Sequence, residues 1–500
     1  MFKFHAPGQD YLLPPSLKEL IPPGDLVEVI EEIVPLLDIA PLTKKYHRLG
    51  QHAYYPGMLL SVLFYAYSQG VFSSRKIAER LCFDVRFMYL SGRQRPDFRT
   101  ISDFRKDNLD LLKTYFVAIV RLCQELGMVP LQHLAIDSTK IKASASPKRQ
   151  KDRPGLQHQL AELDTRIAQL LQYAQSTDEE EDQAPDTPVG KQLTDSRQRR
   201  QQLLDAKAKL DADPHQQQVN LTDPDCRVQK EQGPGYNCQL AVDSHSQVIV
   251  AAEVVPNPND TAQLLPLIAQ AEANTRSRGH PKQVSADAGY ATTAAYKGLA
   301  DQPHLDAYVP PQGQDRQRGR PTPPYDKYHF RFDPVGGRCT CPQGHPMTLR
   351  GKRNQAGITR FDFRGISCPN CPVKIHCTPS RFREVCVTEA DRLVSSMRAK
   401  LATPAGYRAM TFRKCTAEPV MGHLKEHLGF RRFRLLGLPK VAGEFALVCT
   451  AHNLKKLHQY LGGSRLTEML AAIRAGTGKW VVSVIFWLRF RVVFIPNFAR

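Results

Sequence analysis

The first quarter of the chain has the apolar spacing of packed helices. Between residues 16 and 125, apolar side chains recur at three- and four-residue steps, and residues 58–64 are almost entirely apolar. A stripe of this kind marks the buried face of a helix, and an unbroken apolar run marks a helix that is buried on every side. The pattern predicts an all-helical N-terminal domain over residues 1–128.

Two of these predicted helices are rich in basic residues. One begins at Ser73 or Ser74 and runs to about Leu90, and the next follows Thr100, which forms a capping-box pattern with Asp103. A short turn containing glycine joins them, as in helix-turn-helix units that bind DNA. Helical pairs are common and most bind nothing, so the interpretation depends on the basic side chains. These are Arg75, Lys76, Arg93, Arg95, Arg99, Arg105 and Lys106.

After residue 128 the pattern changes to short apolar runs with the length of strands. Residues 131–136 predict a buried strand that ends at Asp137, and the segment QVSAD predicts another that ends at Asp287. The other elements of this part are a β-hairpin over 235–255, a helix from Asp260 or Thr261, a helix over 293–301 and a strand over 306–310. This order predicts a mixed α/β sheet with acids at strand ends, where open α/β folds bind ligands. The alternative for Asp137 is a turn aspartate that caps the next segment.

Residues 147–220 interrupt this sheet with a polar, glutamine-rich segment. Its apolar residues are spaced four, three, four and three apart, which is an a/d seam: Leu156, Leu160, Leu163, Ile167 and Leu170. An acidic turn containing proline leads to a second predicted helix. We therefore expect an inserted antiparallel helical hairpin whose role is structural or in self-association.

A second insertion, over residues 312–390, is rich in cysteine. Five of the chain's 12 cysteines crowd between Cys339 and Cys377, in a protein whose cysteine content is too low for a disulfide scaffold. The predicted ligands of a tetrahedral structural Zn²⁺ site are Cys341, Cys368, Cys371 and Cys377. Cys339 and His345 are substitute ligands, and simple reduced cysteines are the alternative.

Charge narrows the class of protein further. The chain has 68 Lys and Arg against 49 Asp and Glu, a net charge of +19. This surplus favours a polyanionic partner, most often nucleic acid. The N-terminal residues lack the apolar run of a signal peptide, and the C-terminal tail, 461–500, lacks one long enough for a membrane span. We expect a cytoplasmic, nucleoid-associated protein that does not bind membranes; a packed strand, a dimer contact and a readthrough extension remain open for the tail.

The stretch 407–437 places Glu418 among many basic residues. If the stretch is helical, five residues share one face: Thr411, Lys414, Glu418, Gly422 and Lys425. A carboxylate in such a row suits metal binding beside phosphate binding. The alternative is a solvated basic helix with one ion pair, and Pro419 either kinks the helix or begins it.

Five sequence blocks together resemble the bacterial insertion-sequence transposases of the DDE type. They are PDFRTISDFRK, LAIDSTKIKASAS, GYNCQLAVDSHSQVIVAAEVVPNPND, SADAGY and AEPVMGHLKEHLGFRRFRLLGLPKVAGEFALVCTAHNLKKL. The resemblance implies an RNase H-like catalytic core over 129–460, with a triad at Asp137, Asp287 and Glu418. In the family signature Tyr-x2-Arg-x3-Glu-x6-Lys, Thr411 and Lys414 replace the Tyr and the Arg. Lys414 keeps the charge without the bidentate fork.

The resemblance also implies a chemistry and a set of partners. The triad would hold two Mg²⁺ ions, with Mn²⁺ as a substitute, for cut-and-paste transposition by hydrolysis and strand transfer. The expected partners are double-stranded DNA at the element's terminal inverted repeats and at the target, and a second copy of the chain in a DNA-bound homodimer. The expected DNA-binding residues are Lys414, Lys425, Arg431, Arg432, Arg434, Arg99 and Arg105. The alternatives are an inactive DNA-binding derivative and an RNase H-like nuclease that does not join strands.

Overall fold

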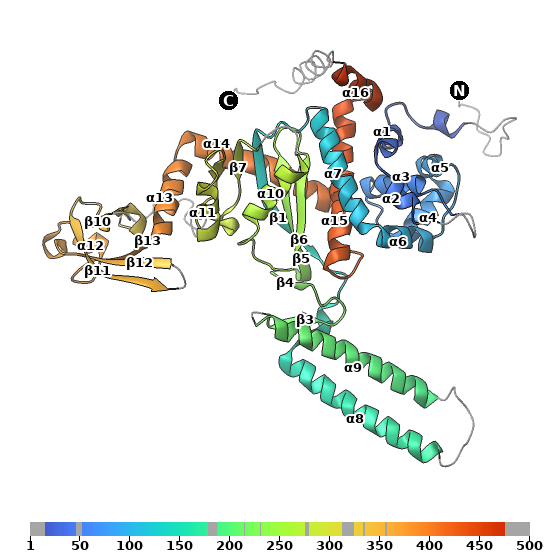
Figure 1. The fold of residues 1–500 in the computed structure, drawn as a ribbon, viewed down its shortest axis with the longest axis horizontal. Coiled ribbons are helices and arrows are strands. Elements are labelled where there is room, and N and C mark those ends of the chain that lie inside the picture. Colours follow the sequence, from blue (N-terminus) through green and yellow to red (C-terminus); the bar gives the residue numbers. More distant parts are fainter. Residues whose placement is uncertain are drawn as a thin grey trace, which may run out of the picture.

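The chain has a mixed α/β fold with two projecting insertions (Figure 1). The computed structural model describes residues 16–46, 53–178, 188–214, 216–230, 232–275, 280–312, 325–333, 336–355 and 358–475. The apolar stretch of the predicted tail, beyond residue 475, lies outside these ranges. Within them, no helix combines the length and the apolar character needed to cross a bilayer.

The N-terminal region is helical, as its apolar spacing predicts. Its helices are α1 (Leu26–Ile33), α2 (Ala40–Thr43), α3 (Pro56–Ser68), α4 (Ser74–Phe83), α5 (Val85–Leu90), α6 (Phe98–Asp107) and α7 (Leu109–Glu125). The predicted single helix to Leu90 breaks at Asp84, whose side chain caps α5 through the Arg86 amide. The predicted capping box at Thr100 is wrong, because Asp97 caps α6 by accepting from the Thr100 amide at 2.7 Å. α6 and α7 also separate at Asn108.

Six strands of the described residues form the central sheet. They are β1 (His133–Lys142), β4 (Arg227–Gln229), β5 (Gly233–Asp243), β6 (Ile249–Val255), β7 (Gln283–Ser285) and β8 (Asp306–Tyr308). The order is β4-β5-β1-β7-β8, and β6 also pairs with β5. β5 runs antiparallel to β1 and β6, whereas β1, β7 and β8 are parallel.

Asp137 lies in the middle of β1 and not at its end, so the predicted strand boundary is wrong. The strand continues through polar residues to Lys142, which pairs with Gly235 of β5. Side chains alternate between the two faces of a strand, so successive polar residues of this half of β1 point to opposite faces of the sheet. Pairing with the buried strand β5, and not an apolar pattern, holds this half in place.

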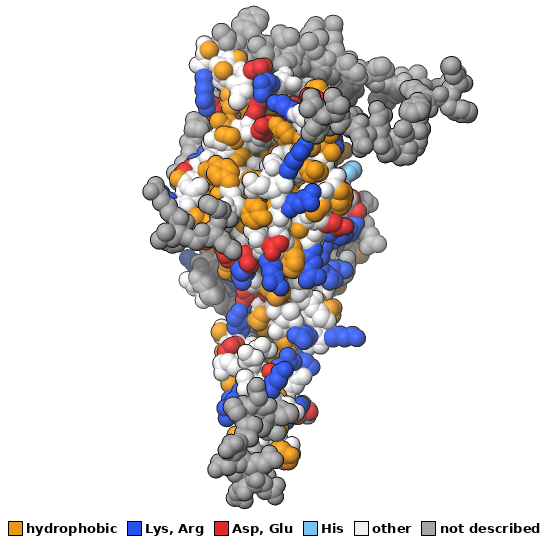
Figure 2. Space-filling model, turned by 90° about the vertical axis from the view of Figure 1, so that its right-hand side faces the viewer, with side chains coloured by type: hydrophobic (Ala, Val, Ile, Leu, Met, Phe, Trp, Pro, Cys, Tyr) orange, Lys and Arg blue, Asp and Glu red, His pale blue; other side chains and the backbone are white. Residues whose placement is uncertain are grey.

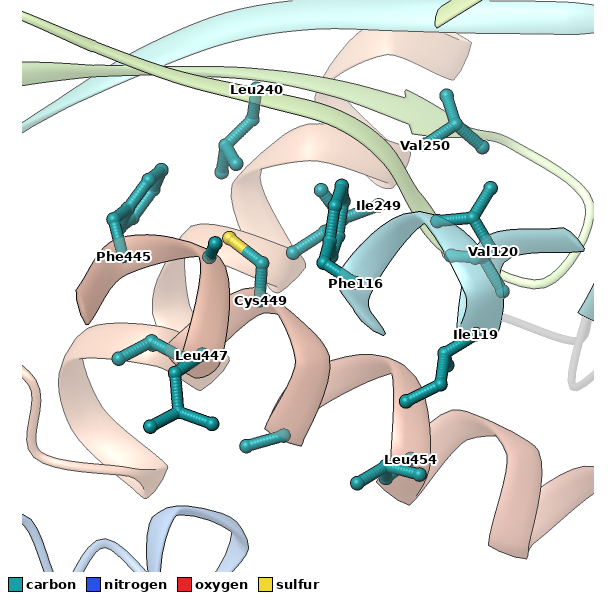
Figure 3. Packing of buried hydrophobic residues seen from close by; sticks show 14 of the residues in the cluster. Phe116, Ile119, Val120, Leu240, Ile249, Val250, Phe445, Leu447, Cys449 and Leu454 are labelled. Atoms are coloured by element: carbon teal, nitrogen blue, oxygen red, sulfur yellow. The ribbon is translucent and has the colours of Figure 1, made fainter. Parts of the chain in front are cut away.

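Helices cover the sheet and connect it to the N-terminal region. They are α10 (Leu264–Asn274), α11 (Thr293–Ala300), α13 (Glu389–Leu401), α14 (Pro404–Gly422), α15 (Leu438–Leu461) and α16 (Leu466–Arg474). α15 packs on α7, α3 and β6, and Figure 3 shows its Phe445 and Cys449 beside Leu240 of the sheet and Phe116 of α7. α15 is buried on all sides over residues 443–454 because it lies between the sheet and the N-terminal helices.

The first insertion is a helical hairpin that projects from the sheet (Figure 1). It contains β2 (Gln150–Asp152), α8 (Arg153–Asp178), α9 (Pro188–Ala212) and β3 (Gln218–Asn220). Apolar residues of the two helices, including Leu156 and Leu203, form a small separate core. At its base, Asp225 binds Lys209 of α9 at 2.6 Å and the Leu438 amide of α15 at 2.9 Å. The hairpin is thereby tied to the central helix.

The second insertion carries a five-stranded antiparallel sheet of its own. Its elements are β9 (Arg331–Asp333), β10 (Arg338–Thr340), β11 (Pro346–Gln355), β12 (Ile358–Gly365), α12 (Lys374–Cys377) and β13 (Glu384–Thr388). The strands enclose a separate apolar cluster that includes Phe363 and Val385. This sheet lies at the end of the molecule opposite the N-terminal helices (Figure 1).

Candidate active site

Two of the predicted acids come together where β1 and β7 run side by side. Asp287 follows β7 and caps the next turn by accepting from the Gly289 amide at 2.9 Å. Asp137 accepts from the Ser138 amide at 2.8 Å. Burial raises the pKa of Asp137 to about 6; the nearby Asp287 carboxylate adds to this rise, and Arg413 opposes it. The two carboxylates therefore interact inside a partly buried site.

Arg413 of α14 reaches into this site and was not singled out by the sequence. Its Nη1 lies 2.6 Å from Asp137 Oδ2, and the two side chains are only 9% and 15% exposed. The signal was available, because Arg413, Ala417 and Val420 recur at steps of four and three residues and form the buried stripe of α14. The family signature directed attention to Lys414, which lies one position away and is only partly buried.

Glu418 lies on the exposed side of the same helix. It lies five positions after Arg413, which places the two side chains roughly 140° apart around an α-helix. The largest charge effects on Asp137 come from Arg413 and Asp287. The structure therefore gathers two acids of the predicted triad and leaves the third on the outer face of α14.

The predicted common face of this segment does not extend to Lys425. A π-helical turn, His423–His427, follows α14 and changes the angle between successive side chains. Lys425 consequently lies half-buried beside the sheet, where burial chiefly lowers its pKa and the positive charges of Arg431 and Lys140 lower it further. It also lies close to Cys238, which pairs in register with Thr139 on β1.

A further carboxylate, Asp260, lies beside the acid pair. Its Oδ1 accepts from Asn237 Nδ2 and Gln239 Nε2, each at 2.7 Å, and lies 3.3 Å from Lys140 Nζ. Burial alone would raise the pKa of Asp260, but the bonds from Asn237 and Gln239 bring it below its ordinary value. Asp260 ends the PNPND block, and the local sequence predicts only a helix start there.

Gly289 and Tyr290 connect Asp260 to the acid pair. A Cβ on Gly289 would lie 3.0 Å from Asp287 Oδ1 and 3.1 Å from Asp260 Oδ2, so a side chain here would push against both carboxylates. Burial and the charges of Asp260, Asp137 and Asp287 raise the pKa of Tyr290 well above its ordinary value. The charges of three carboxylates therefore act on one buried tyrosine.

The basic residues after Lys425 lie along the far end of β1. The Phe433 amide donates to the Lys142 carbonyl at 2.9 Å, which holds this segment against the strand. Arg431 is ion-paired with Glu426, and both side chains are 62% exposed. Arg432 and Arg434 are also exposed. The segment therefore presents cationic side chains to solvent from a fixed backbone.

In the N-terminal domain, Arg105 is separated from the other basic residues. It is 5% exposed, and its Nη1 donates to Tyr67 Oη and to the Phe72 carbonyl, each at 2.9 Å. The DNA contact predicted for Arg105 is therefore not available in this position. Six of the basic residues named for the predicted helix-turn-helix region are exposed: Arg75, Lys76, Arg93, Arg95, Arg99 and Lys106. Figure 2, which views the face of the N-terminal helices, shows Lys and Arg side chains gathered across its middle.

The four predicted zinc ligands line one cavity of about 30 Å³ in the second insertion. Burial is the main cause that raises the pKa of Cys377, Arg383 lowers it, and the three other cysteines raise it further. The substitute ligand Cys339 lies in the apolar cluster beside Met347, whereas His345 lines the cavity. Among the described residues, no three of these sulfurs lie within 4.8 Å of one another.

Two family comparisons match parts of the chain. The family described as "Transposase DDE domain" matches residues 340–458, and the "Transposase domain (DUF772)" matches residues 15–107. No curated protein matches the chain. Among solved structures, the chain is similar to the cryo-EM structure of the piggyBac transposase synaptic complex with hairpin DNA. The identity is 10%, the alignment covers 96% of this chain and 86% of that chain, and the TM-score is 0.32.

Proposed function

This chain belongs to the DDE transposases of insertion sequences, and from that premise we propose that it cuts DNA at the ends of its own element and joins them to a target. The observation that carries the proposal is the meeting of Asp137 and Asp287 at neighbouring parallel strands. One acid lies in the middle of its strand and the other follows the end of the neighbouring strand. Neither strand needs a buried acid in order to fold, so their proximity points to a functional site. The strand order and directions of the central sheet support an RNase H-like core.

The acids of this region are of the type that holds divalent metal ions, and among the described residues no three of their ligand atoms lie within 4.8 Å of one another. Asp137, Asp287 and Asp260 place carboxylates in one partly buried region, and carboxylate oxygens are the preferred ligands of Mg²⁺. Burial makes the charged form of Asp137 unfavourable, and a bound cation would stabilise that form. We propose that Asp137 and Asp287 are ligands and that Glu418 joins them when α14 adjusts on DNA. When bound, two ions would supply activation of the attacking oxygen and stabilisation of the leaving oxygen.

The remaining steps belong to the chain's own side chains. Arg413 holds the Asp137 carboxylate in place through its 2.6 Å contact. Lys425 and Lys414 would bind phosphates of the strand being cut, and the exposed arginines of the N-terminal helices, including Arg99, would hold the duplex of the terminal repeat. Water attacks the phosphodiester in line, forms a bond to phosphorus and releases the 3′-OH of the element, leaving a 5′-phosphate on the other fragment. That 3′-OH then attacks a phosphodiester of the target; a new P–O bond joins element to target, and the broken P–O bond leaves a free 3′-OH on the target strand. A homodimer would bring the two ends of the element together.

The test is an assay of cleavage and strand transfer with the full chain, Mg²⁺ and duplexes that carry the element's ends. Asp137→Asn should abolish both products and leave DNA affinity unchanged, because the substitution removes a carboxylate and no phosphate contact. Cleavage without joined products would favour a nuclease. DNA binding by the wild-type chain without any cleavage would favour an inactive DNA-binding derivative. Equal loss of cleavage and binding in the variant would make Asp137 structural.

We also propose that the cavity of the second insertion holds a structural Zn²⁺. Four thiols around one small cavity are a donor set that suits zinc, provided that the sulfurs move inward to about 2.3 Å from the ion. Metal analysis of the purified chain should find zinc that is lost in Cys368→Ser. A zinc-free protein in which all four thiols react freely under native conditions would refute this site.

A further inference from the structure

A second group of side chains that can bind a metal lies at the amino ends of β7 and β8, whereas Asp287 follows the carboxyl end of β7. Glu272 is near the end of α10, His280 lies in the segment before β7, and His304 lies in the segment before β8. β7 and β8 are parallel, so the two histidines meet at the amino ends of these strands. β7 then runs away from them towards Asp287. The group is therefore separate from the candidate active site and from the cysteine cavity.

We propose that Glu272, His280 and His304 form a zinc site. One ligand atom from each residue lies within 4.8 Å of the others, and no other such group of three occurs among the described residues. His280 Nδ1 is 2.9 Å from Glu272 Oε1, and His304 Nε2 is 4.0 Å from the same oxygen. Ligands about 2.0–2.2 Å from a tetrahedral zinc ion lie about 3.3 Å apart, so small side-chain rotations would bring all three atoms onto one ion.

The second imidazole separates this group from an ordinary surface ion pair. The rings of His280 and His304 have centroids 4.6 Å apart. Two protonated rings at this distance would repel each other, and the single carboxylate of Glu272 can balance only one of them. Two neutral imidazoles can share a divalent cation through their lone pairs, with Glu272 as the anionic ligand and water in the fourth position.

The donor set also selects the ion. Two imidazole nitrogens and one carboxylate suit zinc and its transition-metal neighbours, whereas Mg²⁺ and Ca²⁺ prefer sites made of oxygen. An ion here would join three segments that are far apart in sequence. It would fix the entry of β7 and β8 into the sheet, and so support the strand that leads to Asp287. The role is structural and does not depend on the proposed DNA chemistry.

The experiment is a metal titration of the full-length protein, with Co²⁺ as a spectroscopic probe and Zn²⁺ in competition with a chromophoric chelator. Co²⁺ on thiolates gives strong near-ultraviolet charge-transfer bands that histidine and glutamate ligands do not give, so the two proposed zinc sites are distinguishable. The variants are His280→Gln and His304→Gln. The matched control is His158→Gln, because His158 makes a 3.6 Å contact with Glu162 but has no second imidazole.

The wild type and His158→Gln should each bind one more zinc ion per chain than His280→Gln or His304→Gln does. The thiolate bands should be the same in all four proteins. At a minimum, loss of one histidine should weaken zinc binding about 10-fold, since even outer-shell partners of metal ligands contribute about 10–100-fold. Zinc should also raise the melting temperature of the wild type more than that of either variant. Equal zinc stoichiometry and affinity in all four proteins would overturn the proposal. Equal metal-free melting temperatures would show that the variants are folded.

Discussion

At the scale of single residues, the candidate active site depends on space as much as on charge. Gly289→Ala adds a methyl group about 3.0 Å from the carboxylate oxygens of both Asp287 and Asp260, closer than ordinary contact. The carboxylates must move apart, and we expect DNA cleavage to fall about 10-fold or more, because small displacements of catalytic groups cost large factors in rate. DNA affinity, measured on the same duplex by fluorescence anisotropy, should not change.

The control for this substitution is Gly422→Ala. Gly422 is the last residue of α14, and a Cβ there would meet no atom within 4 Å. It should cleave DNA at the wild-type rate. Equal cleavage by the Gly289 and Gly422 variants would show that the spacing of Asp260 and Asp287 does not matter for activity.

His133 makes the free energy of unfolding of the protein depend on pH. It is buried, contacts Ser285 Oγ at 2.8 Å, and burial lowers its pKa to about 4. The unfolded chain, with an ordinary histidine pKa near 6.5, takes up the proton first as pH falls. The stability advantage of wild type over His133→Gln should therefore be constant above pH 7.5 and should shrink between pH 6.5 and 4, by about 1.4 kcal/mol per pH unit. Urea unfolding at several pH values measures this, and parallel curves for the two proteins would contradict it.

The sequence indicates single candidate residues where a local pattern carries the information. Asp137 and Asp287 are candidates because each follows an apolar run. Arg413 and Asp260 were missed because their roles depend on contacts across the fold. Arg413 lies 276 positions from Asp137, and Asp260 lies 120 positions from Lys140. No local pattern reports such a pairing, which exists only once α14 has packed on β1.

At the scale of elements, α14 is held in place through a backbone carbonyl that lacks its usual helical hydrogen bond. Pro419 has no amide hydrogen, so the Cys415 carbonyl one turn earlier loses its helical donor. Gln247 Nε2, from the turn between β5 and β6, donates to that carbonyl at 3.1 Å. Gln247 Oε1 also accepts from Lys456 of α15 at 2.7 Å. One turn residue therefore holds both helices that flank the candidate site.

A double-mutant cycle tests this arrangement. Gln247→Leu should lower the free energy of unfolding by about 1–2 kcal/mol, because it removes two hydrogen bonds. In a Pro419→Ala background, the restored amide of residue 419 can bond the Cys415 carbonyl, so Gln247→Leu should cost measurably less there. The Lys456 contact is lost in both backgrounds and cancels. An identical cost in both backgrounds, measured by denaturant unfolding, would mean that Gln247 does not serve the carbonyl freed by Pro419.

Element boundaries were less predictable than element types. The two predicted long helices break at Asp84 and Asn108, polar residues that compete with helical bonding through their side chains. The second half of β1 was missed because DSTKIK has no strand pattern; pairing with β5 maintains it. The shared face expected for Glu418 and Lys425 fails because the π-helical turn between them is not visible in helical spacing.

At the scale of the whole molecule, a buried charged group connects the N-terminal helices to the sheet. Glu444 of α15 is fully buried and accepts from the amides of Arg434 and Leu435 at 2.9 and 3.0 Å. Burial raises the pKa of Glu444, and the nearby Arg105 of α6 opposes this rise. Arg105 thus stabilises the buried Glu444 carboxylate, which holds the backbone at Arg434. The exposed arginines are not needed for that role and can bind a polyanion.

The basic segment after α14 offers the sharpest test of how the whole chain meets DNA. Arg431, Arg432 and Arg434 are exposed along a backbone that is pinned to the end of β1. Arg431 already has Glu426 as an ion-pair partner. Arg432 is therefore the better position to remove, since its loss disturbs neither that pair nor the backbone bonds to Lys142.

Arg432→Ala should weaken binding to specific and non-specific duplexes alike, because a phosphate contact carries no sequence information. The slope of log K against log salt concentration should become shallower by roughly 0.9, the contribution of one phosphate contact. Arg474→Ala is the control: it removes the same charge from α16, where Arg474 pairs with Glu125 at 2.8 Å, and should leave the slope unchanged. A wild-type slope together with a lower melting temperature for Arg432→Ala would make Arg432 a structural residue and would move the DNA interface away from this end of β1.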